Sequence, residues 1–397
     1  MSELAVTGAE AAAPRPPLGA DGSPPGAGRG LSALLPTPDL VSTKLLELRK
    51  RTGLMITVVL LTVGFPVLVL GIRLLLHAVD PSSFGPAGSP GLFSGLTNAM
   101  AEFGFIIAAT VGATAGATDL SEGVFRQLVV TGRNRVALYL ARIPAGLSIL
   151  VPLAGAGFAV VCLVTSFAGL PEPTAARMNG VSVPMRLSEG QLESWLLTHP
   201  NQATQLAGLP LLASGGGSGA VAKLGPSSPA EQPAAVRKAR AEVRKHIGTI
   251  YSTYTLAEVT QSNPAVNEMA KIGAWLELEV AIGFLAGLGL GSLTGQRTVS
   301  TISLIALQLI VTPILAANVI PYFINGQRLV VGLAMDQLRP IALGSANGGG
   351  GPRAALFGGR GALSIPPMPT WAMVAVIVGW MVVWSAVGAF RMARRDA

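Results

Sequence analysis

Charged residues are scarce in this chain of 397 residues. Asp, Glu, Lys and Arg together make up 12% of it, about half of what an ordinary soluble domain carries. Hydrophobic residues, in contrast, make up 50% of the chain. This balance excludes an ordinary soluble domain and indicates a protein that lives in a membrane.

Cysteine is almost absent as well. The one cysteine, Cys162, lies inside an apolar run, which excludes an intrachain disulfide framework and a cysteine-based metal site. The three histidines, His77, His199 and His246, show no metal-binding spacing. The sequence therefore predicts neither a metal nor a cofactor on this chain.

Motifs for nucleotide binding and covalent catalysis are also missing. No Gly-Lys dipeptide occurs, which excludes a Walker A phosphate loop, and no Gly-x-Ser-x-Gly elbow occurs. Residues 187–191 read Leu-Ser-Glu-Gly-Gln, similar to the signature peptide of ATP-binding-cassette ATPases. Without a phosphate loop, we interpret this similarity as accidental and expect that the chain itself is not an enzyme.

A net charge of +8 raises the question of a nucleic-acid partner. The Lys and Arg residues gather at the ends of apolar runs, for example in Lys44–Arg51 and Arg391–Arg395. Basic residues in such places set the orientation of membrane helices and meet lipid headgroups. The expected partner of this charge is membrane lipid, and no nucleic-acid partner is expected.

Long apolar runs dominate the rest of the chain. A helix that crosses a membrane needs ~20 such residues, and six runs supply them: residues 54–78, 99–118, 136–167, 272–293, 299–320 and 371–390. Pro66 and Pro313 are expected to kink or interrupt the first and fifth runs. The predicted fold is an all-α polytopic membrane protein with six transmembrane helices, in the cell membrane, with both termini cytoplasmic.

The predicted spans divide the chain into five regions. Residues 1–38 read as a disordered cytoplasmic tail, and residues 39–53 as an amphipathic interfacial helix whose Leu40, Leu45 and Leu48 face lipid. Spans 1–3 occupy 54–169, and spans 4–6 occupy 272–397 with an outer loop at 321–369. Within that loop, residues 322–338 are expected to form one or two short helices that dip partly into the membrane.

A long stretch without a span, 170–271, separates spans 3 and 4. Alternation of the spans predicts a large extracytoplasmic insertion there, and its sequence is largely helical in character. Ser188 and Gln191 form a predicted capping box at the start of one of its helices.

A polar stretch, 119–135, lies between spans 2 and 3. Asp119 and Glu122 can form a capping box that starts a short helix, and Gly132 can end it, with Arg133 and Arg135 at the negative end of the helix dipole. Its three arginines indicate the cytoplasmic side.

Glycines recur every fourth residue in span 4. Gly283, Gly287, Gly291 and Gly295 fall on one side of a helix, where a neighbouring helix can approach closely. Packing within the chain is the simpler interpretation, and a role in a dimer or a substrate pathway is the alternative. Glu277 and Glu279 are interpreted as solvated residues at the outer end of this span, and Arg142 of span 3 as an arginine that reaches the interface.

Taken in order, these features resemble the permease subunit of type-2 ATP-binding-cassette transporters. The resemblance covers roughly 39–397, apart from the insertion. It is carried by Lys44-Leu45 in the amphipathic helix, by Glu122-Gly123 through Leu128 to Arg135, by the outer segment after span 5, and by the closing Arg394-Arg395-Asp396-Ala397.

The resemblance implies an exporter subunit in which the 119–135 stretch is a coupling helix. It would dock onto a separate ATPase chain, so that ATP is bound and hydrolysed on the partner. A second permease subunit, identical or homologous, would complete the pore. The residues that would contact the ATPase are Glu122, Gly123, Phe125, Arg126, Leu128, Arg133 and Arg135.

Two other functions stay open on the sequence. The chain could be a structural or sensory membrane protein whose 170–271 insertion is an extracytoplasmic binding module. It could also be an ion-driven transporter, which would need buried proton-relaying groups in mid-membrane.

Overall fold

A computed structural model describes residues 36–81, 83–121, 134–168, 175–178, 181–199, 206, 234–317, 323–343 and 368–394. Most of the expected N-terminal tail, much of the insertion and part of the outer loop therefore lie outside the described residues.

Within the described part of the chain, five helices are long and apolar enough to cross a membrane. They are the run Thr52–Val79, which joins α2 (Thr52–Val59), η2 (Leu60–Gly64) and α3 (Phe65–Val79); α4 (Pro90–Ser121); the run Arg135–Ala168, which joins α6 (Arg135–Leu140) and α7 (Arg142–Ala168); α11 (Val266–Thr294); and α17 (Thr370–Arg394). The chain is a helical membrane protein.

The expected fifth span is shorter and irregular. It consists of three consecutive segments, α12 (Arg297–Ala306), η4 (Leu307–Val311) and α13 (Thr312–Ala317), and the rest of the expected span lies outside the described residues. The total of six spans therefore stays a prediction.

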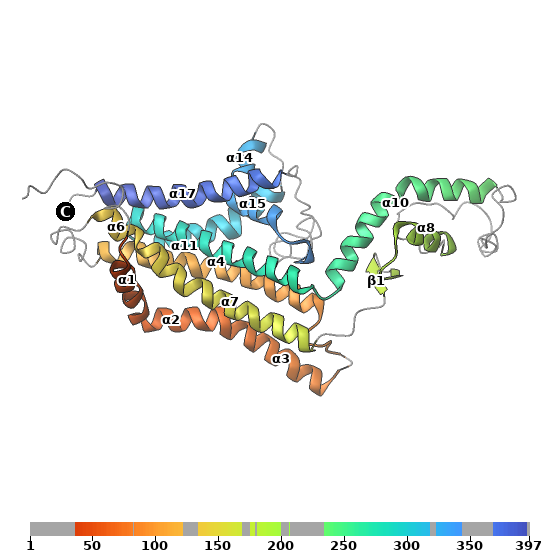
Figure 1. The fold of residues 1–397 in the computed structure, drawn as a ribbon, viewed down its shortest axis with the longest axis horizontal. Coiled ribbons are helices and arrows are strands. Elements are labelled where there is room, and N and C mark those ends of the chain that lie inside the picture. Colours follow the sequence, from red (N-terminus) through yellow and green to blue (C-terminus); the bar gives the residue numbers. More distant parts are fainter. Residues whose placement is uncertain are drawn as a thin grey trace, which may run out of the picture.

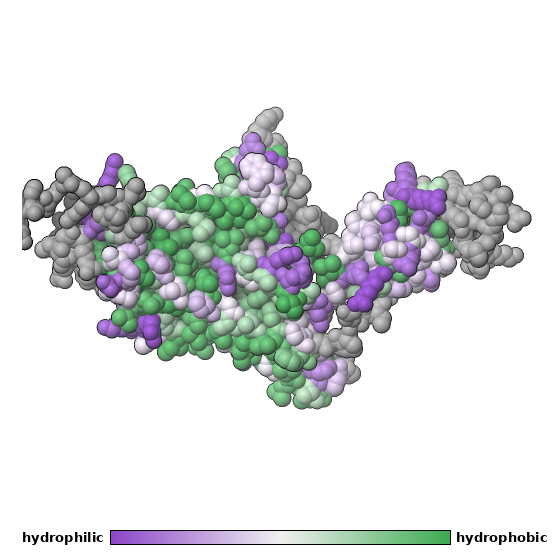
Figure 2. Space-filling model, in the orientation of Figure 1, coloured by the Kyte–Doolittle hydropathy of each residue, from purple (hydrophilic) through white to green (hydrophobic). Residues whose placement is uncertain are grey.

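The helices form a bundle with two distinct ends (Figure 1). The short helix α1 (Pro38–Lys50), α6 and the carboxyl end of α17 lie at one end. The insertion, with α8 (Glu189–Thr198) and α10 (Ala234–Gln261), projects from the opposite end. Apolar residues cover the visible face of the bundle, and hydrophilic residues gather on the insertion (Figure 2). The end of the bundle with α1 is called the α1 end below, and the opposite end is called the insertion end.

Helix α11 is the centre of the bundle. It packs against α4, α7, α12 and α17. In its most apolar stretch of 18 residues, 72% is buried, whereas the corresponding stretch of α17 is 17% buried. Two apolar clusters meet on it, one towards the insertion end around Trp275 and one towards the α1 end around Phe284. The outer helices instead expose large apolar side chains, as membrane-facing helices do.

Two π-helical turns interrupt the spans, and each comes just before a proline. Segment η2 precedes Pro66, and η4 precedes Pro313. A proline has no N–H for the carbonyl four residues earlier and clashes with it, so a wider turn relieves the conflict. The carbonyl that Pro66 leaves without a helical donor is that of Thr62, and Gly157 of α7 packs directly on this oxygen.

The amphipathic helix at the N-terminus differs from the prediction. Helix α1 forms as expected, but Leu40 and Leu48 are buried and do not face lipid. Leu40 packs with Ala137, Leu138 and Ala141 at the start of the third span, and Leu45 is half-buried. Protein therefore covers part of the apolar side of α1. Lys44 is also buried and forms an ion pair with Glu47 at 2.8 Å.

The insertion contains a small sheet, which the all-α prediction missed. Strands β1 (Ala175–Met178) and β2 (Val181–Pro184) pair antiparallel, with Met178 opposite Val181. They share one apolar cluster with α8 and α10, centred on residues such as Val183, Leu192 and Tyr254. The insertion therefore has a core of its own.

Polar contacts also hold this core together. The Tyr254 hydroxyl donates to the carbonyl of Pro184 at 2.8 Å and accepts from the Leu187 N–H at 3.0 Å. Burial raises the pKa of Tyr254, which keeps the hydroxyl protonated as a donor. The predicted capping box of Ser188 and Gln191 at the start of α8 is confirmed.

Short helices after α13 fold back into the bundle. Helices α14 (Ile324–Arg328) and α15 (Val331–Leu338) are followed by the 3-10 turn η5 (Ile341–Leu343). The Trp380 indole N–H of α17 donates to the Leu329 carbonyl at 2.7 Å. Trp380 lies ten residues after the start of α17, which is ~15 Å along a helix, or about half the thickness of a hydrocarbon core.

Candidate functional site

The polar stretch between α4 and α6 is described only at its two edges. Helix α4 continues to Ser121, so Asp119 is a residue within a helix and not the cap of a new one; this part of the prediction is wrong. The helix continues for about one turn beyond residue 118, where the apolar run ends. Glu122, Gly123, Phe125, Arg126, Leu128 and Arg133 lie outside the described residues.

Arg135 is the first residue of α6. The Asn134 side chain caps this helix by accepting from the Val136 N–H at 2.9 Å. Arg135 therefore lies at the positive end of the α6 dipole, whereas the sequence predicted it at the negative end of a preceding helix. The cap is local and strong, and it fixes where the third span begins.

A buried arginine joins the two edges of this stretch. Arg142, at the start of α7, is 2% exposed and donates from Nη1 to the Gly116 carbonyl of α4 at 3.5 Å. It does not reach the interface as the sequence suggested, because α4, α6 and α7 cover it. Nearby, Tyr139 of α6 is fully buried, with Gly388 of α17 directly against its hydroxyl.

Arg142→Ala is expected to loosen both edges of the stretch. The change removes a buried polar contact and leaves a cavity between the helices, so amide hydrogen exchange in 112–121 and 134–141 should accelerate severalfold. Arg391→Ala removes an exposed arginine at the same end and serves as the control. Equal exchange rates in the two variants would contradict the anchoring role of Arg142.

Three of the four glycines in the α11 stripe pack on α4. A methyl group added to Gly283 would lie 2.7 Å from the Phe105 carbonyl oxygen, and one added to Gly291 would lie 2.6 Å from that of Ala113. A methyl group on Gly287 would collide with the Ala109 carbonyl oxygen. The stripe therefore lets two helix backbones touch, as the simpler interpretation predicted.

The contact is reciprocal, and the fourth glycine has a different role. Gly112 and Gly116 of α4 lie against the backbone of Phe284 and Leu288 in the same way. Gly295 has φ 68° and is the C-cap of α11, so it ends the helix. A left-handed cap of this kind favours glycine.

An acidic residue lies deep in α11. Glu279, the fourteenth residue of the helix Val266–Thr294, is 4% exposed and so is not a solvated outer residue. Glu277 is half-buried, and its Oε1 lies 3.2 Å from where a methyl group on Gly155 would be. Buried acids inside spans are costly and usually functional, and the sequence interpretation of Glu279 is corrected.

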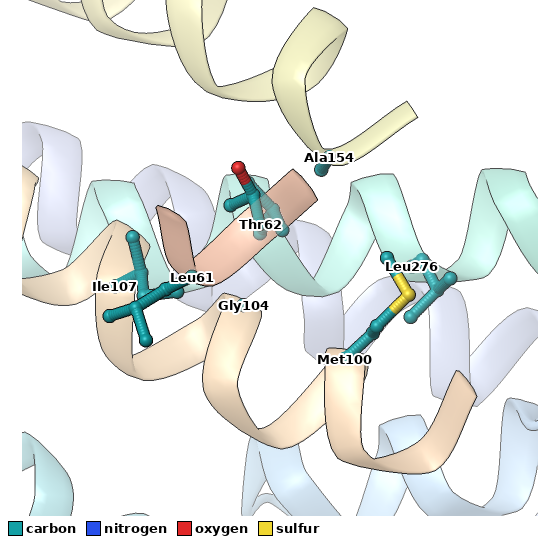
Figure 3. A pocket seen from close by; sticks show the side chains of 8 residues that line it. Leu61, Thr62, Met100, Gly104, Ile107, Ala154 and Leu276 are labelled. Carbon is teal, nitrogen blue, oxygen red and sulfur yellow. The ribbon is translucent and has the colours of Figure 1, made fainter. Parts of the chain in front are cut away.

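An apolar cavity lies beside the π-helical turn η2 (Figure 3). It encloses about 20 Å³, little more than one water molecule needs. The residues that line it come from η2, α4, α7 and α11: Leu61, Thr62, Met100, Gly104, Ile107, Ala154, Leu276 and Val280. This cavity has room for little more than a water molecule.

The described residues hold no group of three or more His, Cys, Asp or Glu side chains arranged to bind a metal ion. The buried polar side chains of the described residues include amides, hydroxyls, Arg142 and Glu279.

Comparison with known proteins gives no relative. No family model matches the chain, no curated protein matches it, and no solved structure matches it.

Proposed function

We propose that the chain is the membrane-spanning permease subunit of an ATP-driven exporter of the type-2 ATP-binding-cassette family. A separate ATPase would hydrolyse ATP, and the 122–133 stretch would transmit its movement to the spans. The observation that carries this proposal is the pair of short helices α14 and α15, which follow α13 and fold back beside α17. The family resemblance implies such re-entrant helices at this place.

The charge distribution supports a cytoplasmic α1 end. Basic residues at the ends of spans favour the cytoplasm. At the α1 end they are Arg49, Lys50, Arg51, Arg135, Arg297, Arg391 and Arg394. The acidic residues described there are fewer, among them Asp39 and Glu47. With this orientation, the 122–133 stretch faces the cytoplasm, where an ATPase can reach it, and the insertion is extracytoplasmic.

The sidedness predicts a simple labelling pattern. In a Cys162→Ser background, a cysteine at exposed Glu189 should react with a membrane-impermeant maleimide on intact cells. A cysteine at exposed Arg49 should react only after the membrane is opened. The reverse pattern would place the 122–133 stretch outside the cell, where no cytoplasmic ATPase can reach it, and would contradict the proposed function.

The small size of the described cavity agrees with a pore formed between two permease subunits. The cavity beside η2 holds about 20 Å³, so we place the substrate path at an interface with a second, identical or homologous subunit. Proteoliposomes that contain the purified complex test the proposal. Accumulation of an apolar dye should require ATP, and accumulation without ATP would contradict it.

One observation favours an ion-driven transporter as a second candidate. Glu279 is a buried carboxyl in the middle of a central helix, the kind of group that carries protons in such proteins. A protonophore that stops transport while ATP stays high would favour this candidate. Continued transport under the same conditions would favour the ATP-driven one.

The separate core of the insertion favours a sensory protein as a third candidate. Its cluster of β1, β2, α8 and α10 residues is distinct from the clusters of the bundle. A sensory protein should keep its function when Glu122 and Arg126 are replaced, because an ATPase contact would then play no part.

A further inference from the structure

Side chains of neighbouring helices hold the backbone of the segment 324–343 in place. Besides the bond from Trp380 to Leu329, the Trp275 indole N–H of α11 donates to the Met335 carbonyl at 3.1 Å. The Gln337 side chain accepts from the Met368 N–H at 2.9 Å. The segment is therefore hydrogen-bonded to α11, to α17 and to Met368, two residues before α17 begins.

Arg339 makes a contact of a different kind, because it ties this segment to α4. Its Nη2 donates to the Asn98 Oδ1 at 2.5 Å and to the Leu343 carbonyl at 2.9 Å. One guanidinium thus holds α4, the end of α15 and the turn η5 together. Asn98 is 5% exposed and Arg339 is half-buried, so water competes little for this charge-assisted bond.

Helix α15, which ends just before Arg339, is buried at the insertion end of the bundle. Leu333, Ala334 and Met335 of α15 are at most 3% exposed, and Ala334 and Met335 belong to the large apolar cluster that also contains residues of α4 and α11. Helix α10 of the insertion contacts both η5 and α4. The Arg339 contact therefore lies where the insertion, the short helices and α4 meet.

We propose that Arg339 is a positioning residue that latches the segment 331–343 to α4 and so keeps the insertion end of the bundle closed. The proposal deepens the proposed function, and it rests on that function only for its meaning in transport. A permease must open this end to release its substrate, and the segment can move away from α4 only after the bond between Arg339 and Asn98 breaks.

The latch can be tested by the accessibility of a buried thiol, without ATP or an ATPase. In the Cys162→Ser chain, Met335→Cys places a thiol on the buried side of the segment. Native membranes are treated with a membrane-impermeant methanethiosulfonate, and the rate of labelling is measured. Arg339→Gln should raise this rate at least about tenfold, since a bond to a charged group is worth a decade or more in an opening equilibrium. An unchanged rate would overturn the proposal.

Matched variants separate the latch from a general loss of charge. Arg328→Gln removes an arginine from α14, just before the latched segment, and should leave the labelling of position 335 unchanged. Asn98→Leu should raise labelling as much as Arg339→Gln, and the double variant should be no faster than either single variant. Asn98→Asp keeps an acceptor and should stay slow. Fast labelling in Arg328→Gln, or additive effects in the double variant, would overturn the latch.

A second thiol distinguishes a latch from general destabilisation. Ala137→Cys lies buried at the opposite end of the bundle, and its labelling should not change in Arg339→Gln. Faster labelling at both positions would mean that Arg339 stabilises the whole fold, and the latch would fail. If the unmodified protein shows no ATP-driven transport, the proposed function fails. The latch proposal is unaffected by that result, because the labelling rate does not depend on transport.

Discussion

Gly287→Ala is expected to destabilise the bundle by about 3 kcal/mol, the upper end of what overpacking usually costs. The added methyl group would collide with the carbonyl oxygen of Ala109. A backbone atom within a regular helix cannot rotate aside as a side chain can, so α4 and α11 must separate along their shared glycine face. The measurement is the fraction of folded, monodisperse protein after extraction and its thermal unfolding in detergent.

Gly379→Ala provides the matched control for this prediction. Gly379 lies in α17, also within a span, and nothing stands within 4 Å of a methyl group added there. Replacement by alanine should leave stability unchanged or slightly raise it, because alanine favours a helix more than glycine does. Similar stability of the Gly287 and Gly379 variants would contradict the close packing of α4 on α11.

The second large effect is expected from the stretch between α4 and α6. Glu122→Ala combined with Arg126→Ala should lower ATP-driven transport at least tenfold, because the proposed function places charged contacts to the ATPase at these two residues. The ATPase should continue to hydrolyse ATP, since its own active site is unchanged. The measurement is substrate transported per ATP hydrolysed in proteoliposomes.

A charge pair at the other end of the bundle controls for the loss of two charges. Glu268 and Lys271 form an ion pair at 2.6 Å at the start of α11, and Lys271 is largely exposed. Removal of both should change stability and transport little, as is usual for surface pairs. Equal losses from the two double variants would mean that the 122–133 stretch has no special role.

Much of the bundle could be predicted from the sequence because its signals are local. Runs of apolar residues reveal membrane helices whatever they pack against, and the glycine stripe reveals a close helix contact through its spacing alone. The capping box at Ser188 is another local signal, since both partners lie within three residues. These features depend on one helix at a time.

Other features depend on a partner that is distant in the sequence. The burial of Leu40 and Lys44 requires α6 and α7 to cover α1, and the burial of Glu279 requires the helices around α11. Arg142 illustrates the same limit, because the carbonyl that it contacts belongs to Gly116, 26 residues earlier. Hydropathy alone assigns such side chains to an interface.

The small sheet of the insertion also has a local sequence signal. Asn179-Gly180 separates the two strands of the insertion, and Asn-Gly is the strongest short sequence signal for a hairpin. The alternation of apolar residues in Val181–Pro184 also agrees with a strand that is buried on one side. Both observations could have predicted the small sheet.

One candidate site has a local sequence signal, and the other depends on a contact between residues distant in the sequence. The charged stretch between the second and third spans stands out in the sequence, although the structure describes only its edges. The contact of Arg339 with Asn98 joins residues 241 positions apart, and neither residue belongs to a motif. Only the fold brings them together.

Crosslinking from the 122–133 stretch tests the central proposal most directly. A single cysteine replaces Leu128 in a Cys162→Ser chain, and a short thiol-reactive crosslinker is applied to native membranes. We predict a crosslinked product that contains an ATPase with a phosphate-binding loop, and a shift in its yield when ATP is added. Absence of any ATPase from the crosslinked and purified material, together with transport that needs no ATP, would contradict the account.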